Sequence, residues 1–115
     1  SYFYSVSVAS DGSVYAAGDI YGTSTYDFGN SVTVTGTHSG SNILLVKYAS
    51  SGTAQWAQTT TVGSSNSFFY GVSVGSDGSV CAAGSIGGTS TYDFGISVTA
   101  EGTYSGNNIV LVKYY

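Results

Sequence analysis

The sequence has very few charged side chains, no proline and no methionine. Only Lys47 and Lys113 are cationic, charged residues make up 7% of the 115 residues, and the net charge is −4. A nucleic-acid-binding surface needs clustered lysine and arginine to displace phosphate counterions, so this composition excludes nucleic acid as a partner. It also argues against docking on anionic membranes. Membrane insertion is not expected, because no stretch approaches the roughly 20 apolar residues that span a bilayer.

Cysteine and helix-forming residues are equally scarce. A single cysteine, Cys81, excludes a disulfide within the chain and leaves oxidising and reducing compartments both open. Glutamate, lysine, arginine and methionine are nearly absent, and no apolar run has the 3.6-residue period of a helix. The 17 glycines, together with abundant serine and threonine, indicate short strands joined by tight turns. The composition therefore predicts an all-β chain.

The chain repeats itself. Residues 1–49 and 67–115 align without a gap at an offset of 66 (67 − 1), and 36 of the 49 aligned positions are identical. Such a period indicates one supersecondary unit used repeatedly, each copy burying its apolar faces against the next. We therefore divide the chain into a first repeat, 1–66, and a second repeat, 67–115, which has no equivalent of residues 50–66. The missing initiating methionine favours a processed product or a piece of a longer repeat array.

Each repeat predicts the same strands and turns. In the first repeat, strands are expected at residues 3–9, 14–20, 25–28, 31–35, 42–48 and 53–61. The first two form a hairpin around the tight turn at Asp11-Gly12, and the two short strands form a second hairpin around Gly29-Asn30. The small residues 16–18 are expected to let a neighbouring sheet approach closely. Residues 42–48 form a nearly continuous apolar run, which is typical of a strand covered on both faces.

Two segments, DGSVYAAG (residues 11–18) and NILLVKYASSGTAQWAQ (residues 42–58), resemble the repeats of seven-bladed β-propellers in bacterial secreted and surface proteins. The second repeat matches with DGSVCAAG (77–84) and NIVLVKY (108–114). The resemblance implies tandem β-propeller blades. Each blade would be a four-stranded antiparallel sheet with an extra small hairpin, and the second would lack its last strand.

The same resemblance implies a non-enzymatic structural or interaction scaffold located outside the cell, at the bacterial surface or in the periplasm. Propeller repeats host many functions, so the family identifies no activity by itself. Two features depart from the family pattern. The repeat exceeds the ~40–45 residues of the commonest blades, which the TYDFG hairpin explains, and Asn42 and Asn108 stand where the family often has aspartate.

The number of blades determines whether this chain is expected to need a partner. Propellers close with about 4–8 blades of four strands, and two adjacent repeats leave apolar sheet faces in water. The uncovered side chains, such as Val6, Val8, Ile43 and Leu45, would cost a monomer ~10 kcal/mol or more. We therefore expect a homo-oligomer or further repeats of the same chain, with the open edge of the second sheet receiving a strand from another chain. Head-to-tail addition without closure would make a self-assembling fibre or tube, a second alternative function.

Six charged residues are expected to have structural roles: Asp11, Asp77, Asp27, Asp93, Lys47 and Lys113. Asp11 and Asp77 precede glycine in predicted turns and are interpreted as turn residues rather than calcium ligands, because no series of carboxylates supplies the 6–8 oxygens that calcium needs. Asp27 and Asp93 are expected to cap the small hairpin or to pair with the two lysines, whose places in apolar strands demand a partner.

No residue pattern predicts catalysis, a cofactor or a metal. His38 has no second ligand at metal-binding spacing and is replaced by Tyr104 in the second repeat, so it is interpreted as a surface loop residue. Cys81 takes the place of Tyr15 and is expected to be a small buried hydrophobe. Glu101 has no counterpart in the first repeat. With one histidine and no G-x-S-x-G motif, a nucleophilic triad has no basis, and the chain is predicted not to be an enzyme.

The 11 tyrosines and five phenylalanines leave one binding function open. Four tyrosines fall in or near turns, where exposed rings can stack on sugar faces: Tyr21, Tyr26, Tyr92 and Tyr104. A carbohydrate-binding module with glycan partners is therefore the first alternative function. The competing interpretation is that aromatic rings fill the space between sheets. We expect such packing for most of them, in particular for Tyr4, Tyr48, Tyr70 and Tyr114.

Overall fold

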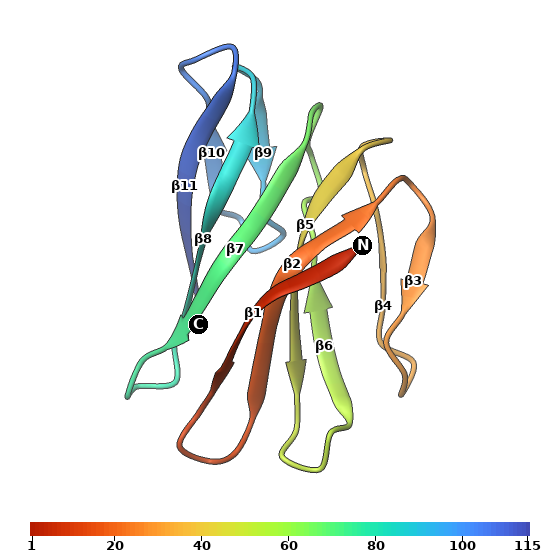
Figure 1. The fold of residues 1–115 in the computed structure, drawn as a ribbon, viewed down its shortest axis with the longest axis vertical. Helices are drawn as coiled ribbons and strands as arrows, with labels where there is room; N and C mark the ends of the chain where they lie inside the picture. The colour runs from red at the N-terminus through yellow and green to blue at the C-terminus, as the bar shows by residue number, and fades with distance from the viewer.

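The computed structural model describes residues 1–115 and has two antiparallel sheets that lie side by side (Figure 1). The first sheet has the order β1 (Tyr2–Val8), β2 (Val14–Tyr21), β5 (Ser41–Tyr48) and β6 (Ala54–Gln58). The second has the order β11 (Asn107–Tyr114), β8 (Val80–Gly87) and β7 (Ser67–Val74). Two short hairpins accompany them: β3 (Thr25–Asp27) with β4 (Thr33–Thr35), and β9 (Thr91–Asp93) with β10 (Thr99–Glu101). The all-β prediction is confirmed, and no sheet closes on itself.

The two repeats use identical pairing. Ala17 lies opposite Leu45 in the first sheet, and Ala83 lies opposite Leu111 in the second, at the same offset of 66 (83 − 17; 111 − 45). β1 and β7 also share a bulge at the same place in the strand. At Gly18 a side chain would overlap the carbonyl of Tyr2 in β1. This glycine therefore serves close approach within its own sheet, not approach of the neighbouring sheet as predicted.

Alternation along the strands gives each sheet two apolar faces. We call one the Leu face; in the first sheet it carries Ala17, Ile43 and Leu45. The opposite one is the Val face, which carries Val6, Val14, Ala16 and Val46 there. The second sheet has the same two faces, formed by the residues 66 positions later.

The two sheets pack through unlike faces. The Leu face of the first sheet meets the Val face of the second, and 12 buried residues form the main core there: Tyr15, Ala17, Ile43, Leu45, Phe69, Val80, Ala82, Ile86, Tyr92, Phe94, Val112 and Tyr114. The β9–β10 hairpin contributes Tyr92 and Phe94 to this core. A smaller cluster of Ile20, Val34, Leu44 and Val46 lies under the β3–β4 hairpin, on the Val face of the first sheet.

Nearly the same strand sequence is buried in one repeat and exposed in the other. In β5, Ile43 and Leu45 are 0% exposed, as expected for a strand covered on both faces. The expectation that two repeats leave these two side chains in water is therefore wrong, because the second sheet packs on them. In β11, their counterparts Ile109 and Leu111 are 96% and 69% exposed. The expectation of two-sided burial therefore fails for β11, because nothing packs on the Leu face of the second sheet.

The connection between the repeats also differs from the prediction. The predicted strand at 53–61 leaves the first sheet after Gln58, and the chain then pairs with β9 of the second repeat. The N–H of Thr61 donates to the carbonyl of Asp93 at 2.9 Å, and the N–H of Asp93 donates to the carbonyl of Val62 at 3.0 Å. The chain after Gln58, which we call the linker, therefore connects the first repeat to the β9–β10 hairpin of the second by backbone hydrogen bonds.

Asn42 holds the loop between β4 and β5. Its side-chain oxygen accepts hydrogen bonds from the backbone N–H groups of Thr37 at 3.2 Å and His38 at 2.8 Å. Its amide donates to the carbonyls of Gly22 at 3.0 Å and His38 at 2.9 Å. Asn108 makes the equivalent contacts in the second repeat. Because a carboxylate cannot donate, asparagine and not aspartate fits this position.

We predict that Asn42→Asp lowers the free energy of unfolding by about 2–3 kcal/mol, because it removes two donors inside a buried network. Asn108→Asp should cost less, since Asn108 is only half-buried and bonds at the exposed end of the molecule. Urea unfolding of the two variants measures the difference. Equal losses for both would contradict this role.

Candidate functional site

Asp11 and Asp77 lie in the turns where the sequence places them. Oδ1 of Asp11 accepts a hydrogen bond from the N–H of Ser13 at 2.9 Å, and this bond is the main cause that lowers the pKa of Asp11. Oδ1 of Asp77 accepts from the hydroxyl of Ser79 at 2.6 Å and from its N–H at 3.0 Å. The hydroxyl is the largest cause of the lowered pKa of Asp77. Both carboxylates therefore stabilise their turns in the charged form.

These lowered pKa values predict a loss of stability in acid. A carboxylate with a folded-state pKa below its ordinary value of 3.8 contributes stability that is present above that pH and lost as the pH falls through the folded-state pKa. Replacing both residues (Asp11→Asn with Asp77→Asn) should therefore flatten the acid limb of a melting-temperature profile between neutral pH and pH ~2. Parallel profiles for the variant and the wild type would contradict this.

The expected ion pairs do not form. Oδ1 of Asp27 accepts from the N–H of Gly29 at 2.8 Å, so this residue caps its own hairpin turn, and Asp93 does the same. The ammonium of Lys47 lies over the ring of Tyr15, 5.7 Å from its centroid. Lys113 likewise lies over a ring, that of the C-terminal tyrosine. A lysine at the rim of the apolar face thus satisfies its charge with an aromatic ring and solvent, without a carboxylate.

The four candidate tyrosines do not form one binding surface. Tyr92 is fully buried and donates its hydroxyl to the carbonyl of Gly87 at 2.8 Å, so it cannot contact a ligand. Tyr26 is half-buried and donates to the carbonyl of Tyr21 at 2.7 Å. Tyr21 and Tyr104 are exposed, each on its own repeat. Burial of the aromatic hairpin residues removes the cluster that the turn positions indicated.

The tyrosines that were expected to pack between the sheets differ in their burial. Tyr114 is buried and packs against Phe69 and Trp56. Tyr4 and Tyr70 are exposed and meet at the edge of the interface, with ring centroids 5.3 Å apart.

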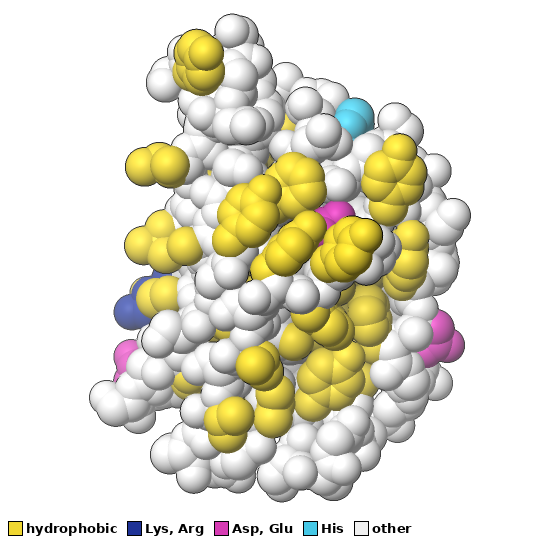
Figure 2. Space-filling model, viewed as in Figure 1, with side chains coloured by type: hydrophobic (Ala, Val, Ile, Leu, Met, Phe, Trp, Pro, Cys, Tyr) yellow, Lys and Arg dark blue, Asp and Glu magenta, His cyan; other side chains and the backbone are white.

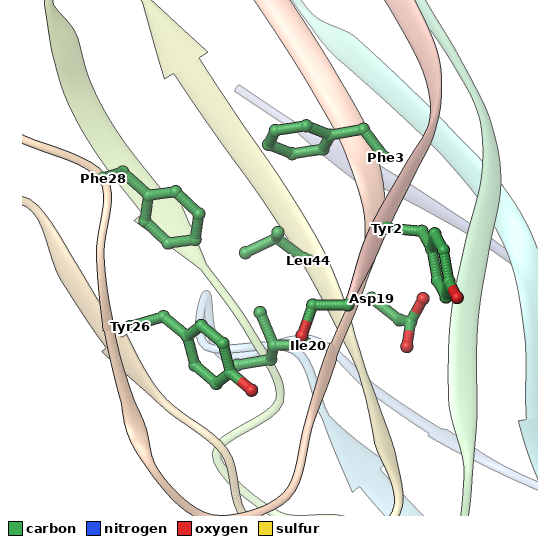
Figure 3. A pocket seen from close by; sticks show the side chains of 8 residues that line it. Tyr2, Phe3, Asp19, Ile20, Tyr26, Phe28 and Leu44 are labelled. Carbon is green, nitrogen blue, oxygen red and sulfur yellow. The ribbon is translucent and has the colours of Figure 1, made fainter.

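An aromatic cavity of about 100 Å³ opens between the first sheet and the β3–β4 hairpin. Its lining consists of Ser1, Tyr2, Phe3, Asp19, Ile20, Tyr26, Phe28 and Leu44. Figure 3 shows Phe3 and Phe28 on opposite sides of the space, with Leu44 between them.

The counterpart of this cavity in the second repeat is closed. Phe69, Tyr92 and Phe94, which correspond to Phe3, Tyr26 and Phe28, are all 0% exposed. Phe69 and Phe94 pack in the main core with Ala17, Ile43 and Leu45 of the first sheet. The linker lies against the hairpin, with Gly63 directly against the ring of Tyr92. In the second repeat, protein atoms fill the space that corresponds to this cavity. The shape of the cavity therefore needs no small-molecule ligand to explain it.

Asp19 is the most unusual polar residue of the molecule, and sequence reasoning missed it. Its pairing with Ile43 places its side chain on the Leu face; it is 3% exposed and its Oδ1 has no hydrogen-bond partner. Figure 3 shows its carboxylate beside Tyr2, away from Phe28. Burial first, and then the negative charge of Asp19, raise the pKa of Tyr4. The available signal was the difference between the repeats, because Ser85 stands at the equivalent position.

A buried carboxylate oxygen without a hydrogen-bond partner is destabilising. We predict that Asp19→Ser, which copies the second repeat, raises the free energy of unfolding by about 1–3 kcal/mol. The reverse change, Ser85→Asp, lies on the uncovered face and should change it little. Thermal unfolding of both variants checks the pair, and a loss of stability in Asp19→Ser would show that the carboxylate has a partner in solution.

No three histidine, cysteine, aspartate or glutamate side chains gather where they could hold a metal ion. Cys81 is half-buried on the second sheet, less covered than predicted, because the Leu face there is open. A groove of about 450 Å³ runs between β4 and the chain after β6, and threonines dominate its lining. Hydroxyl and backbone groups can bind water or sugar hydroxyls, but this groove contains no aromatic ring and no titratable side chain.

No protein-family model matches the chain, and no curated protein matches it. None of its elements is a helix of the length and apolarity needed to cross a membrane.

Proposed function

We propose that this chain is a non-enzymatic repeat segment of the β-propeller kind that serves as an extracellular scaffold by associating with copies of itself or with further repeats. The observation that carries the proposal is the interface between the two sheets. Two nearly identical units bury a 12-residue core between them, and each still presents an apolar face to water. A unit that binds its own copy on one face and leaves the opposite face open is suited to repetition.

The exposed apolar area supports association more than it supports an isolated monomer. Figure 2 shows hydrophobic side chains over β1 and projecting along the edge where β11 lies. The exposed residues of these two areas include Phe3, Val6, Val8, Ile109 and Leu111. Soluble monomers rarely leave large contiguous apolar patches uncovered, and such patches commonly mark protein interaction sites.

The carbohydrate-binding alternative has weaker support. Sugar recognition by stacking needs exposed rings beside hydrogen-bonding groups. Here the threonine-lined groove contains no ring, and the cavity that contains rings has mostly apolar walls. Of the four candidate tyrosines, only Tyr21 and Tyr104 are exposed.

Sedimentation velocity over a series of concentrations tests the proposal. We expect species heavier than the monomer that dissociate on dilution and persist in high salt, since apolar contacts are not screened by ions. A well-folded monomer at every concentration, with native circular dichroism, would refute self-association.

A further inference from the structure

The molecule has two uncovered faces that are opposite in kind. The Val face of the first sheet is open over β1 and β2, where Phe3, Val6 and Val14 border a hollow of about 420 Å³. The Leu face of the second sheet is open over β8 and β11, where Ile109 and Leu111 project into solvent. Inside the molecule, faces of these same two kinds form the main core.

The free faces have nearly the same residues as the buried ones. The buried Val face is formed by Phe69, Val72, Val74, Val80, Ala82, Ile86, Val112 and Tyr114. The residues 66 positions earlier, on the Val face of the first sheet, are identical at all eight positions: Phe3, Val6, Val8, Val14, Ala16, Ile20, Val46 and Tyr48. Phe3, Val6 and Val8 are exposed there, whereas Ile20 and Val46 are already buried in the cluster with Val34 of the β3–β4 hairpin. On the free Leu face, Ala83, Ile109 and Leu111 repeat Ala17, Ile43 and Leu45. Two surfaces that already bind each other within the chain are thus both available between chains.

We propose that a second copy of this chain docks its free Val face, on β1 and β2, onto the free Leu face of β8 and β11, repeating the internal interface between molecules. This inference rests on the proposed self-association and specifies its geometry. Ile109 and Leu111 of one copy occupy the hollow beside Val6 and Val14 of the next, as Ile43 and Leu45 occupy the space against Val80 and Ala82 within the chain.

Contacts at the rim repeat in the same way. The N–H of Ile43 donates to the hydroxyl of Ser67 at 3.0 Å across the internal interface. The equivalent pair between molecules is the N–H of Ile109 with the hydroxyl of Ser1. The Tyr4–Tyr70 contact at the rim, with centroids 5.3 Å apart, likewise has an equivalent between Tyr70 of one copy and Tyr4 of the next.

Three differences between the repeats set the strength of the contact between molecules. Ser85 replaces the buried carboxylate of Asp19, so the free Leu face carries no unpartnered acid and docking buries none. Against this, Cys81 replaces Tyr15, and β11 has no neighbour that supplies a counterpart of Trp56. The docked interface is therefore smaller than the internal one, and the association is reversible on dilution.

Unlike faces make a head-to-tail contact. Such a contact is heterologous: it leaves one free face at each end of every oligomer, and growth stops only if the rotation between copies closes a ring. An isologous dimer, in which like faces meet, has no such free ends. This distinction allows a test with one-faced variants.

The test uses two double variants and one control. The Leu-face variant carries Ile109→Asp and Leu111→Asp, and the Val-face variant carries Val6→Asp and Val8→Asp. All four side chains are exposed in the monomer, so the substitutions leave its core intact. Val98→Asp, at another exposed valine, is the matched control. Circular dichroism establishes that each variant is folded, and sedimentation velocity measures its association.

We expect each one-faced variant to stay monomeric alone, while an equimolar mixture forms a 1:1 dimer that does not grow. Val98→Asp should associate like the wild type. Variants that still associate alone, or a mixture that stays monomeric, would overturn the head-to-tail geometry even if the wild type self-associates. A monomeric wild type would overturn the proposed function together with this inference.

Discussion

The packing of a Leu face on a Val face determines the rest of this structure. Residues of the two kinds meet in one buried core, and neither sheet has another partner of that size. Since each repeat carries both faces, this packing leaves the Leu face of the second sheet uncovered, together with the part of the Val face of the first sheet that the β3–β4 hairpin does not cover. At ~25 cal/mol per Å² of apolar surface removed from water, such burial is the main source of stability available to a chain with almost no ion pairs.

The same constraint explains features that otherwise look unrelated. The aromatic cavity beside Phe28 and the exposed Leu111 lie where a neighbouring repeat would supply atoms, and the unpaired edge of β11 lies where the last strand of its own repeat would pair. Their counterparts in the other repeat are filled by the linker and the first sheet, by the Val face and by β6. We therefore interpret them as unfilled interfaces of a repeating structure.

The repeat and the alternation predicted the strands, the hairpins and the stacking of the sheets, because these depend on local pattern. What the pattern could not predict was which copy of a residue would be buried, since Leu45 and Leu111 have nearly the same local sequence and differ in what packs on them. The pairing of Asp27 with Lys47 was wrong because a hairpin N–H satisfied the carboxylate locally. Asp19 was missed because alternation gives the face on which a residue lies but not what covers that face.

The most direct test of this account compares two identical side chains in the two repeats, by urea unfolding at a concentration low enough to keep the chain monomeric. Leu45→Ala should lower the free energy of unfolding by about 2–5 kcal/mol, because it opens a cavity in the shared core. Leu111→Ala should change it by no more than about 0.5 kcal/mol, because that side chain is already in water. Equal losses at the two positions would contradict the packing of unlike faces on which everything else rests.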